Sequence, residues 1–270
     1  MNPDAVTLID IEKIVKQRAG VRAKYIPNSF FSWLRRFIHE DFINKYLEQG
    51  RMGVDFCQGT LDYLGVKVTV KGKANLPTDA RRYTFVSNHP LGAIDGVTLG
   101  SVLGQFYDGR VKYLVNDLLM NLRGLAPLCV PINKIGAQSR SLPEMVDGAF
   151  RSDNHVIMFP AGLCSRKQGG VVRDLKWGKS FIVKSVQHKR DVVPIHFLGE
   201  NSKRFYRVAN LCKRLRLPNF AMALLPDEMY RSRGNCYEVR IGKPIPWQTF
   251  TKERPATEWA EFVKEEVYKI

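Results

Sequence analysis

Apolar positions in the first 60 or so residues recur at helical spacing. Between residues 4 and 17 they are Leu8, Ile11, Ile14 and Val15, which predicts an amphipathic helix. Residues 25–27 interrupt this pattern, and Asn28 or Ser29 can cap a second helix that runs to about residue 47. The chain therefore begins with a helical region, which we place at residues 1–60.

The second predicted helix has one broad aromatic and apolar face. The residues on that face are Phe30, Phe31, Leu34, Phe37, Ile38, Phe42 and Tyr46. Trp33 lies at its edge, with Arg35 and Arg36 nearby. Aromatic side chains beside arginines suit a helix that lies in a bilayer interface. Helical periodicity alone favours a second alternative, in which this face packs on the protein's own core.

At residue 66 the pattern changes, because residues 66–70 alternate with a period of two, which predicts a strand. The predicted strands are residues 66–70, 83–87, 111–115, 128–132, 156–159, 192–197 and 237–241. The predicted helices between and after them are residues 95–106, 141–151, 176–187, 202–214 and 257–268. Alternation of strands and helices predicts an α/β fold, with a mainly parallel mixed sheet flanked by helices. No linker rich in Pro, Gly or Ser divides it, so residues 61–270 are predicted to form one catalytic domain.

Composition is typical of a folded protein, but the charge is not. The chain has 270 residues, of which 44% are hydrophobic and 25% charged. Lys and Arg number 42 against 26 Asp and Glu, so the net charge is +16. Such an excess indicates an acidic partner, and anionic lipid headgroups, nucleic acid and an acidic carrier protein all meet that description.

Cysteines and apolar runs indicate the compartment. The five cysteines are scattered without a CxxC pair, which favours neither a disulfide framework nor a zinc site, and we expect a reducing cytoplasm. The first residues lack a basic-then-apolar export signal. No apolar stretch approaches the roughly 18 residues that span a bilayer. Any membrane contact is therefore predicted to be peripheral, on the cytoplasmic face.

The strongest chemical signal follows the strand at residues 83–87. The next nine residues read Asn88-His89-Pro90-Leu91-Gly92-Ala93-Ile94-Asp95-Gly96. Histidine is the usual general base because its pKa lies near the operating pH, and a carboxylate on its ring can fix its tautomer. Pro90 disfavours helical geometry at His89. We expect His89 just before a helix, with Asp95 in the first turn reaching back across a bend at Gly92.

A histidine and an aspartate alone are weak evidence, because most such pairs are unrelated surface residues. Three further segments strengthen the interpretation. Residues 159–166, FPAGLCSR, follow a predicted strand and end in a turn whose backbone N–H groups lie beside a cation, as suits an anionic headgroup or an oxyanion. The other two are residues 193–195, VPI, and residues 124–127, GLAP, which lead into residues 130–134.

In their order along the chain, the four segments resemble the four sequence blocks of the glycerolipid acyltransferase superfamily. The best-known members of this superfamily are lysophosphatidic acid acyltransferases. The resemblance runs from about Val66 to Pro246, and its histidine block is the most specific part. It implies that His89 is the catalytic base and Asp95 its orienting acid. It further implies an acceptor site at Phe159, Pro160, Gly162, Ser165 and Arg166, with motif-supporting roles for Asn88, Pro90, Gly92, Gly96 and Pro194.

The resemblance also implies the chemistry and the partners. Family members transfer an acyl group directly from the thioester of acyl carrier protein or coenzyme A to an acceptor hydroxyl. They form no acyl-enzyme and need no metal or other cofactor. The partners implied here are a membrane lipid surface, the acyl thioester and a lyso-lipid acceptor.

Departures from the family pattern bear on the acceptor. Five residues, rather than the usual four, separate His89 from Asp95. Ala161 replaces the family's Glu, and Cys164 replaces its Arg, with Arg166 displaced by two positions. These features look more like the branch that O-acylates lyso-amino-acid lipids, namely ornithine or glycine lipids. A lysophosphatidic acid acyltransferase is the alternative.

Two patterns have competing interpretations. Glycines recur every four residues from Gly92 to Gly104, as in the wall of an acyl-chain channel or in close backbone packing, which is the commoner reason. The basic stretch at residues 203–216, with interleaved aromatics, indicates binding to lipid headgroups or acyl carrier protein, or else a solvated helix face. A nucleic-acid-binding module is the rival class, but it leaves the His89 block without a role, so we predict no nucleic-acid partner.

Overall fold

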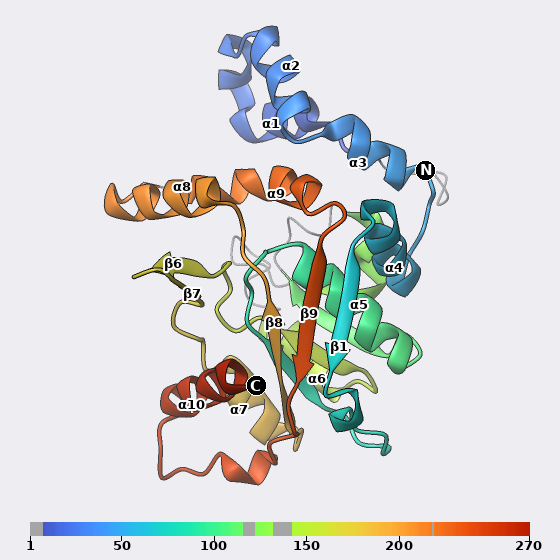
Figure 1. Cartoon of the computed structure of the whole chain (residues 1–270), viewed down its shortest axis with the longest axis vertical. Coiled ribbons are helices and arrows are strands. Elements are labelled where there is room, and N and C mark those ends of the chain that lie inside the picture. Colours follow the sequence, from blue (N-terminus) through green and yellow to red (C-terminus); the bar gives the residue numbers. More distant parts are fainter. Residues whose placement is uncertain (1–7, 116–121, 132–141, 218) are drawn as a thin grey trace.

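A seven-stranded sheet forms the centre of the molecule (Figure 1). The computed structural model describes residues 8–115, 122–131, 142–217 and 219–270. In spatial order the strands are β1 (Lys67–Lys71), β9 (Cys236–Ile241), β8 (Val192–Leu198), β2 (Thr84–Ser87), β5 (His155–Met158), β3 (Val111–Val115) and β4 (Cys129–Pro131). The strands from β8 to β4 are parallel, whereas β9 is antiparallel to β8 and parallel to β1. The predicted mainly parallel mixed sheet is confirmed.

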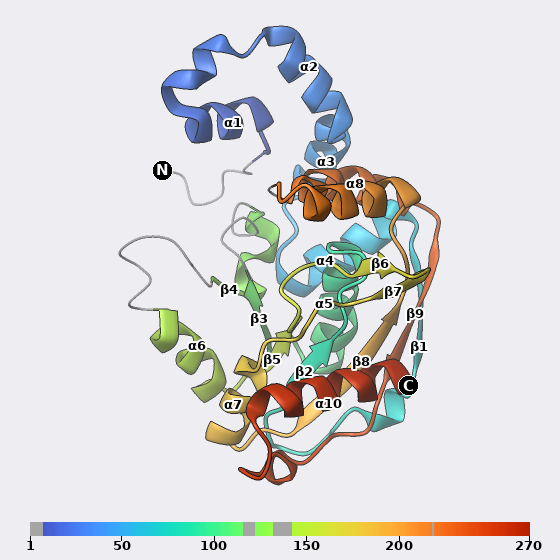
Figure 2. The same ribbon diagram turned by 90° about the vertical axis from the view of Figure 1, so that its left-hand side faces the viewer.

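Helices cover both faces of this sheet (Figures 1 and 2). On one face, α4 (Gly53–Leu64) and α5 (Ile94–Phe106) pack with the apolar side chains of β2, β8 and β9. On the other face lie α6 (Leu142–Arg151), α7 (Ser180–Gln187) and α10 (Ala256–Lys269). The central strands β2 and β5 are buried along their whole length, as expected for apolar strands covered on both sides.

Most predicted elements agree with the structure within a few residues. Three were missed: α4, α9 (Leu225–Arg231) and the hairpin of β6 (Arg166–Gln168) and β7 (Val171–Arg173). The predicted basic helix is α8 (Lys203–Arg214), which Ser202 caps through a hydrogen bond to the Phe205 N–H. The predicted boundary between residues 60 and 61 lies within α4, and the two-domain division stays a prediction. Residues 4–7, 132–134 and 141 of the predicted segments lie outside the described residues.

The N-terminal region is helical, but the single helix predicted over residues 29–47 is wrong. It is two helices, α2 (Asn28–Phe37) and α3 (Glu40–Leu47), which follow α1 (Ile11–Ala19) and a 3-10 turn. His39 separates them with φ 57, a conformation that few non-glycine residues adopt. Its Nε2 lies 2.8 Å from Oδ1 of Asp227, and its ring stacks on Tyr230. These contacts with α9 stabilise the break.

Core packing accounts for only part of the aromatic face of α2, and its contact with a bilayer stays a prediction. Phe31 is 2% exposed and packs toward α1, where Lys16 lies over its ring. Phe30 and Trp33 are 41% and 50% exposed, and Trp33 stacks on Phe37. The prediction that Asn28 or Ser29 caps this helix is wrong, because Pro27 occupies the N-cap position. Within the described residues, no helix is both long and apolar enough to cross a bilayer.

Candidate active site

The loop between β2 and α5 holds the predicted catalytic pair. His89 Nδ1 lies 3.0 Å from Oδ2 of Asp95, whose side chain is fully buried. The same oxygen accepts hydrogen bonds from the N–H groups of Leu91 (2.9 Å) and Gly92 (3.1 Å), and Oδ1 accepts one from Gly96 (2.9 Å). Four donors therefore hold one carboxylate, and it faces the imidazole as the sequence predicts.

Gly92 makes this geometry possible. Its φ of 81° lies in the left-handed region, so the chain bends here between His89 and Asp95. A Cβ at this position would also lie 2.3 Å from Sγ of Cys164. The bend therefore requires glycine for both its backbone conformation and its close approach to a neighbouring segment.

The electrostatic environment favours a charged pair. Burial tends to lower the pKa of His89, but the charge and hydrogen bond of Asp95, with a contribution from Asp174, raise that pKa above its ordinary value. Burial tends to raise the pKa of Asp95, but His89 and two backbone N–H groups hold it below its usual range. If Nδ1–H donates to the carboxylate, the lone pair is on Nε2, so this nitrogen can accept a proton.

Phe159 lies beside this pair, and Pro160 and Gly162 follow it in the same turn, whereas their acceptor-binding role stays a prediction. The Phe159 ring stacks on the His89 ring, with centroids 4.2 Å apart. The Gly162 N–H donates to Phe159 O (2.9 Å) and closes a tight turn in which Gly162 has φ 65. The Pro160 carbonyl accepts a hydrogen bond from the Gly178 N–H. The turn that begins at Phe159 therefore lies next to the imidazole.

Ser165 and Arg166 make hydrogen bonds within the protein around the His89 loop. The Ser165 N–H donates to His89 O (2.8 Å), and its hydroxyl donates to Asp174. Arg166 is buried, donates to the Cys164 carbonyl, and places its guanidinium 5.9 Å from the Phe205 ring centroid on α8. The predicted contact of either side chain with an acceptor headgroup stays a prediction.

The motif-supporting residues connect the loop to the sheet and helices. Asn88 exchanges two hydrogen bonds with the backbone of Phe197, 2.9 Å and 2.7 Å long, which tie the loop to β8. Pro90 O accepts from Asn201, and Pro194 pairs with Val86 between β8 and β2. A Cβ on Gly96 would lie 3.9 Å from the Phe159 ring.

The glycine pattern of α5 serves helix packing at two positions. A Cβ on Gly100 would lie 2.6 Å from Sγ of Cys57, and one on Gly104 would lie 2.6 Å from Val54 Cγ2. The close-packing interpretation is confirmed there, mainly against α4, and Tyr113 Oη of β3 would also lie 3.1 Å from a Cβ on Gly100.

Asp174 is the functional candidate that sequence reasoning missed. This buried carboxylate accepts hydrogen bonds from the His89 N–H (3.1 Å), the Ser165 hydroxyl and the Trp177 indole N–H (2.8 Å). Its own N–H donates to the Tyr268 hydroxyl. Asp174 thus joins the His89 loop to the FPAG segment and to α10. Its separation of 85 residues from His89 left no local signal.

Replacing Asp174 with alanine is expected to lower kcat by roughly tenfold to a hundredfold, because the His89 loop loses a backbone tether. Each buried donor left without a partner costs about 1–3 kcal/mol of folding stability, so the thermal midpoint should also fall. Asp174→Asn, which keeps an acceptor oxygen, should retain more activity, and Asp153→Ala, at an exposed carboxylate, is the matched control. Unchanged kcat in a less stable Asp174→Ala would show a structural role only.

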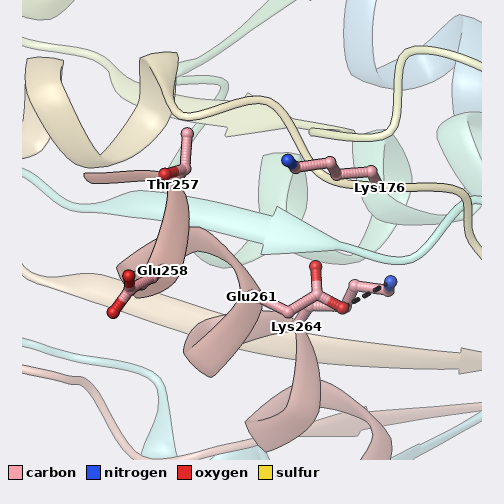
Figure 3. A pocket seen from close by; sticks show the side chains of 5 residues that line it. All are labelled: Lys176, Thr257, Glu258, Glu261 and Lys264. Carbon is pink, nitrogen blue, oxygen red and sulfur yellow. Dashed lines mark hydrogen bonds and ion pairs between the residues drawn. The ribbon is translucent and has the colours of Figure 1, made fainter. Parts of the chain in front are cut away.

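Two cavities lie away from this pair. One, of about 420 Å³, lies between the segment that precedes α7 and helix α10 (Figure 3). It is lined by Lys176, Thr257, Glu258, Glu261 and Lys264. The other, of about 290 Å³, is lined by His39, Asp227, Tyr230, Arg231 and Arg233. None of the predicted site residues lines either cavity, and we assign them no catalytic role.

Two known proteins are similar to this chain over its whole length. The chain is 56% identical to a lyso-glycine lipid O-acyltransferase of Bacteroides thetaiotaomicron over 273 aligned positions that cover all of both chains. It is 55% identical to a lyso-glycine lipid O-acyltransferase of Phocaeicola vulgatus, covering all of this chain and 98% of the other.

The fold is similar to that of a solved structure. This is the 1-acyl-sn-glycerophosphate acyltransferase PlsC of Thermotoga maritima, with a TM-score of 0.50 and 18% identity over 80% of this chain and 77% of the other. A sequence model of a family described as acyltransferase matches residues 13–270. Because this model covers almost the whole chain and the two relatives are more than half identical to it, the protein belongs to the acyltransferase family.

Proposed function

We propose that this chain transfers a fatty acyl group from an acyl thioester to the hydroxyl of a lyso-glycine lipid at the cytoplasmic face of a membrane. The observation that carries the proposal is the His89–Asp95 pair, set against the Phe159–Gly162 turn in a chain 56% identical to a lyso-glycine lipid O-acyltransferase. The donor is a thioester of acyl carrier protein or coenzyme A.

In this mechanism His89 acts as general base and then as general acid. Nε2 accepts the proton of the acceptor hydroxyl while the hydroxyl oxygen attacks the thioester carbonyl. Asp95 stabilises the imidazolium that forms. When the tetrahedral intermediate collapses, the C–S bond breaks and His89 returns the proton to the departing thiolate. The products are an O-acyl ester and a free thiol, with no metal and no resident cofactor in the proposed cycle.

The state of Cys164 supports direct transfer. Its Sγ lies against Gly92 in the His89 loop. Burial raises its pKa to about 12, so it is protonated at neutral pH. A protonated, buried thiol is a poor nucleophile, which argues against a covalent acyl-enzyme at this position.

The side chains of the FPAG turn support an acceptor without a glycerol phosphate headgroup. Ala161 has no polar side-chain atom, and Arg166 is already bonded to the Cys164 carbonyl. A site without a hydrogen-bonding group for a glycerol hydroxyl has little selectivity for that group. An acceptor with an amino-acid headgroup does not require a hydrogen-bonding group for a glycerol hydroxyl in this turn.

The proposal is tested by competition between two acceptors. Purified protein is offered equal amounts of lyso-glycine lipid and lysophosphatidic acid, with acyl carrier protein and coenzyme A thioesters in separate reactions, and the products are measured by mass spectrometry. We expect O-acylated glycine lipid to dominate by at least about tenfold, equivalent to ~1.4 kcal/mol in the transition state. Preferential acylation of lysophosphatidic acid would instead support the alternative acceptor.

A further inference from the structure

The stretch from α8 to the end of the following 3-10 helix (Phe220–Leu224) carries large apolar side chains that the fold does not cover. They are Leu211, Leu215, Leu217, Phe220 and Met222, which are between 39% and 56% exposed. The same stretch carries Lys203, Arg204, Arg207, Lys213, Arg214 and Arg216, all exposed. We call these eleven residues the α8 surface. Residues 201–226 contain no Asp or Glu.

Core packing does not account for the exposed residues of the α8 surface. A separate apolar stripe, formed by Phe205, Tyr206, Ala209 and Cys212, holds α8 on the protein. The first three of these pack with Ala221 and Leu224 in one buried cluster. The helix is therefore already attached by its inner face, while its C-terminal end presents leucines to solvent beside a row of cations.

The segment that leads into α8 contacts the His89 loop. Asn201, two residues before α8, donates from Nδ2 to Pro90 O at 3.1 Å. Asn210 donates to Lys167 O on β6, and the Arg166 guanidinium lies against Phe205. Figures 1 and 2 show α8 beside the β6–β7 hairpin, across the end of the sheet where β2 and β8 finish. Helix α8 and the His89 loop therefore lie at the same end of the sheet.

The N-terminal helices adjoin the same region. Phe37 of α2 packs against the cluster that contains Phe205, and Arg204 lies 5.6 Å from the Phe37 ring centroid. Trp33, half exposed, stacks on Phe37 with centroids 5.1 Å apart. Exposed aromatic residues of α2 thus border the α8 surface.

We propose that the α8 surface docks the enzyme on an anionic lipid bilayer and places the entrance to the His89 loop at the headgroup layer. Leucine and phenylalanine side chains can enter the acyl boundary while surrounding lysines and arginines bind lipid phosphates. An acyl carrier protein would pair with the cations, but exposed apolar side chains in such number favour a bilayer over an acidic protein. That such docking brings the lyso-lipid acceptor to His89 rests on the proposed function.

The test measures partition of the full chain into vesicles. Wild-type protein is sedimented with vesicles of phosphatidylcholine alone or of equimolar phosphatidylcholine and phosphatidylglycerol. A variant with Leu211→Ser, Leu215→Ser and Phe220→Ser should bind the mixed vesicles at least about tenfold more weakly at any salt concentration. A variant with Lys213→Ser, Arg214→Ser and Arg216→Ser should lose the preference for anionic vesicles and most of the salt dependence.

Matched control variants distinguish vesicle binding through the α8 surface from nonspecific binding and from binding through α2. Val183, 45% exposed on α7, lies on a covering helix of the sheet, and Val183→Ser should bind like the wild type. Phe30→Ser with Trp33→Ser reports the contribution of α2 alone. All variants should keep the wild-type thermal midpoint, because each replaced side chain is exposed. Unchanged vesicle binding by the Leu211, Leu215 and Phe220 variant would overturn the proposal.

Further measurements distinguish the competing partners. Loss of acyl carrier protein binding in the cation variant, with vesicle binding intact, would assign the α8 surface to the carrier protein instead. Salt-sensitive binding to oligonucleotides, with none to vesicles, would assign it to nucleic acid. The apolar variant should still acylate a short-chain, monomeric lyso-lipid but lose activity on vesicle-bound acceptor. A wild type that acylates neither acceptor would overturn the proposed function, whereas vesicle partition alone decides the docking proposal.

Discussion

Replacing His89 with alanine is expected to lower acyl transfer to lyso-glycine lipid by about 10²–10⁴-fold, the usual contribution of a positioned general base. The loss should appear in kcat, because the proton is transferred during bond formation rather than during binding. The fold should survive, since Asp95 keeps its hydrogen bonds from the Leu91, Gly92 and Gly96 N–H groups. Steady-state kinetics with the thioester donor measures the effect.

The control for His89→Ala is a histidine of similar exposure outside the loop. His188, at the end of α7, binds Asp147 of α6, and its side chain is 13% exposed against 17% for His89. His188→Ala should therefore keep wild-type kcat. Circular dichroism and the thermal midpoint should show that both variants are folded. A folded His89→Ala protein that retained more than about a tenth of wild-type kcat would exclude His89 as the base.

The His89–Asp95 geometry could be predicted because the sequence encodes it locally. Six positions separate the two residues, Pro90 keeps His89 out of the helix, and Gly92 supplies the left-handed bend. Local rules for proline and glycine are sufficient to bring such a pair together. The alternating strands were predictable for the same reason, since side-chain period is a property of a few consecutive residues.

Features that depend on distant contacts could not be predicted. The break at His39 is stabilised by Asp227 and Tyr230, and the tether of the catalytic loop is Asp174. The β6–β7 strands are three residues each, too short for alternation to reveal them. The antiparallel direction of β9 also follows from long-range pairing with β8, because periodicity carries no strand direction.

Asp95→Asn is expected to lower kcat on the order of 10³–10⁴-fold with little change in the fold. An amide oxygen can still accept hydrogen bonds from backbone N–H groups, so the turn at Gly92 can persist. The amide cannot stabilise an imidazolium as a carboxylate does. If the amide instead turns its NH₂ group to the position of Oδ2, Nδ1 must accept rather than donate, which puts the proton on Nε2, where the base needs a lone pair. In that orientation the Leu91 and Gly92 N–H groups also lose their acceptor.

The pH profile of the Asp95 variant provides the more specific test. The rate falls at low pH as His89 becomes protonated, and in the wild type Asp95 raises the pKa of His89 against the opposing effect of burial. Removing that charge lowers the pKa, so the acidic limb of kcat/KM should move to lower pH in Asp95→Asn. Asp174→Asn should shift it less, because Asp174 bonds the His89 backbone N–H rather than the ring. An Asp95→Asn protein with wild-type kcat and an unshifted acidic limb would show that the buried carboxylate caps the loop without acting on the base.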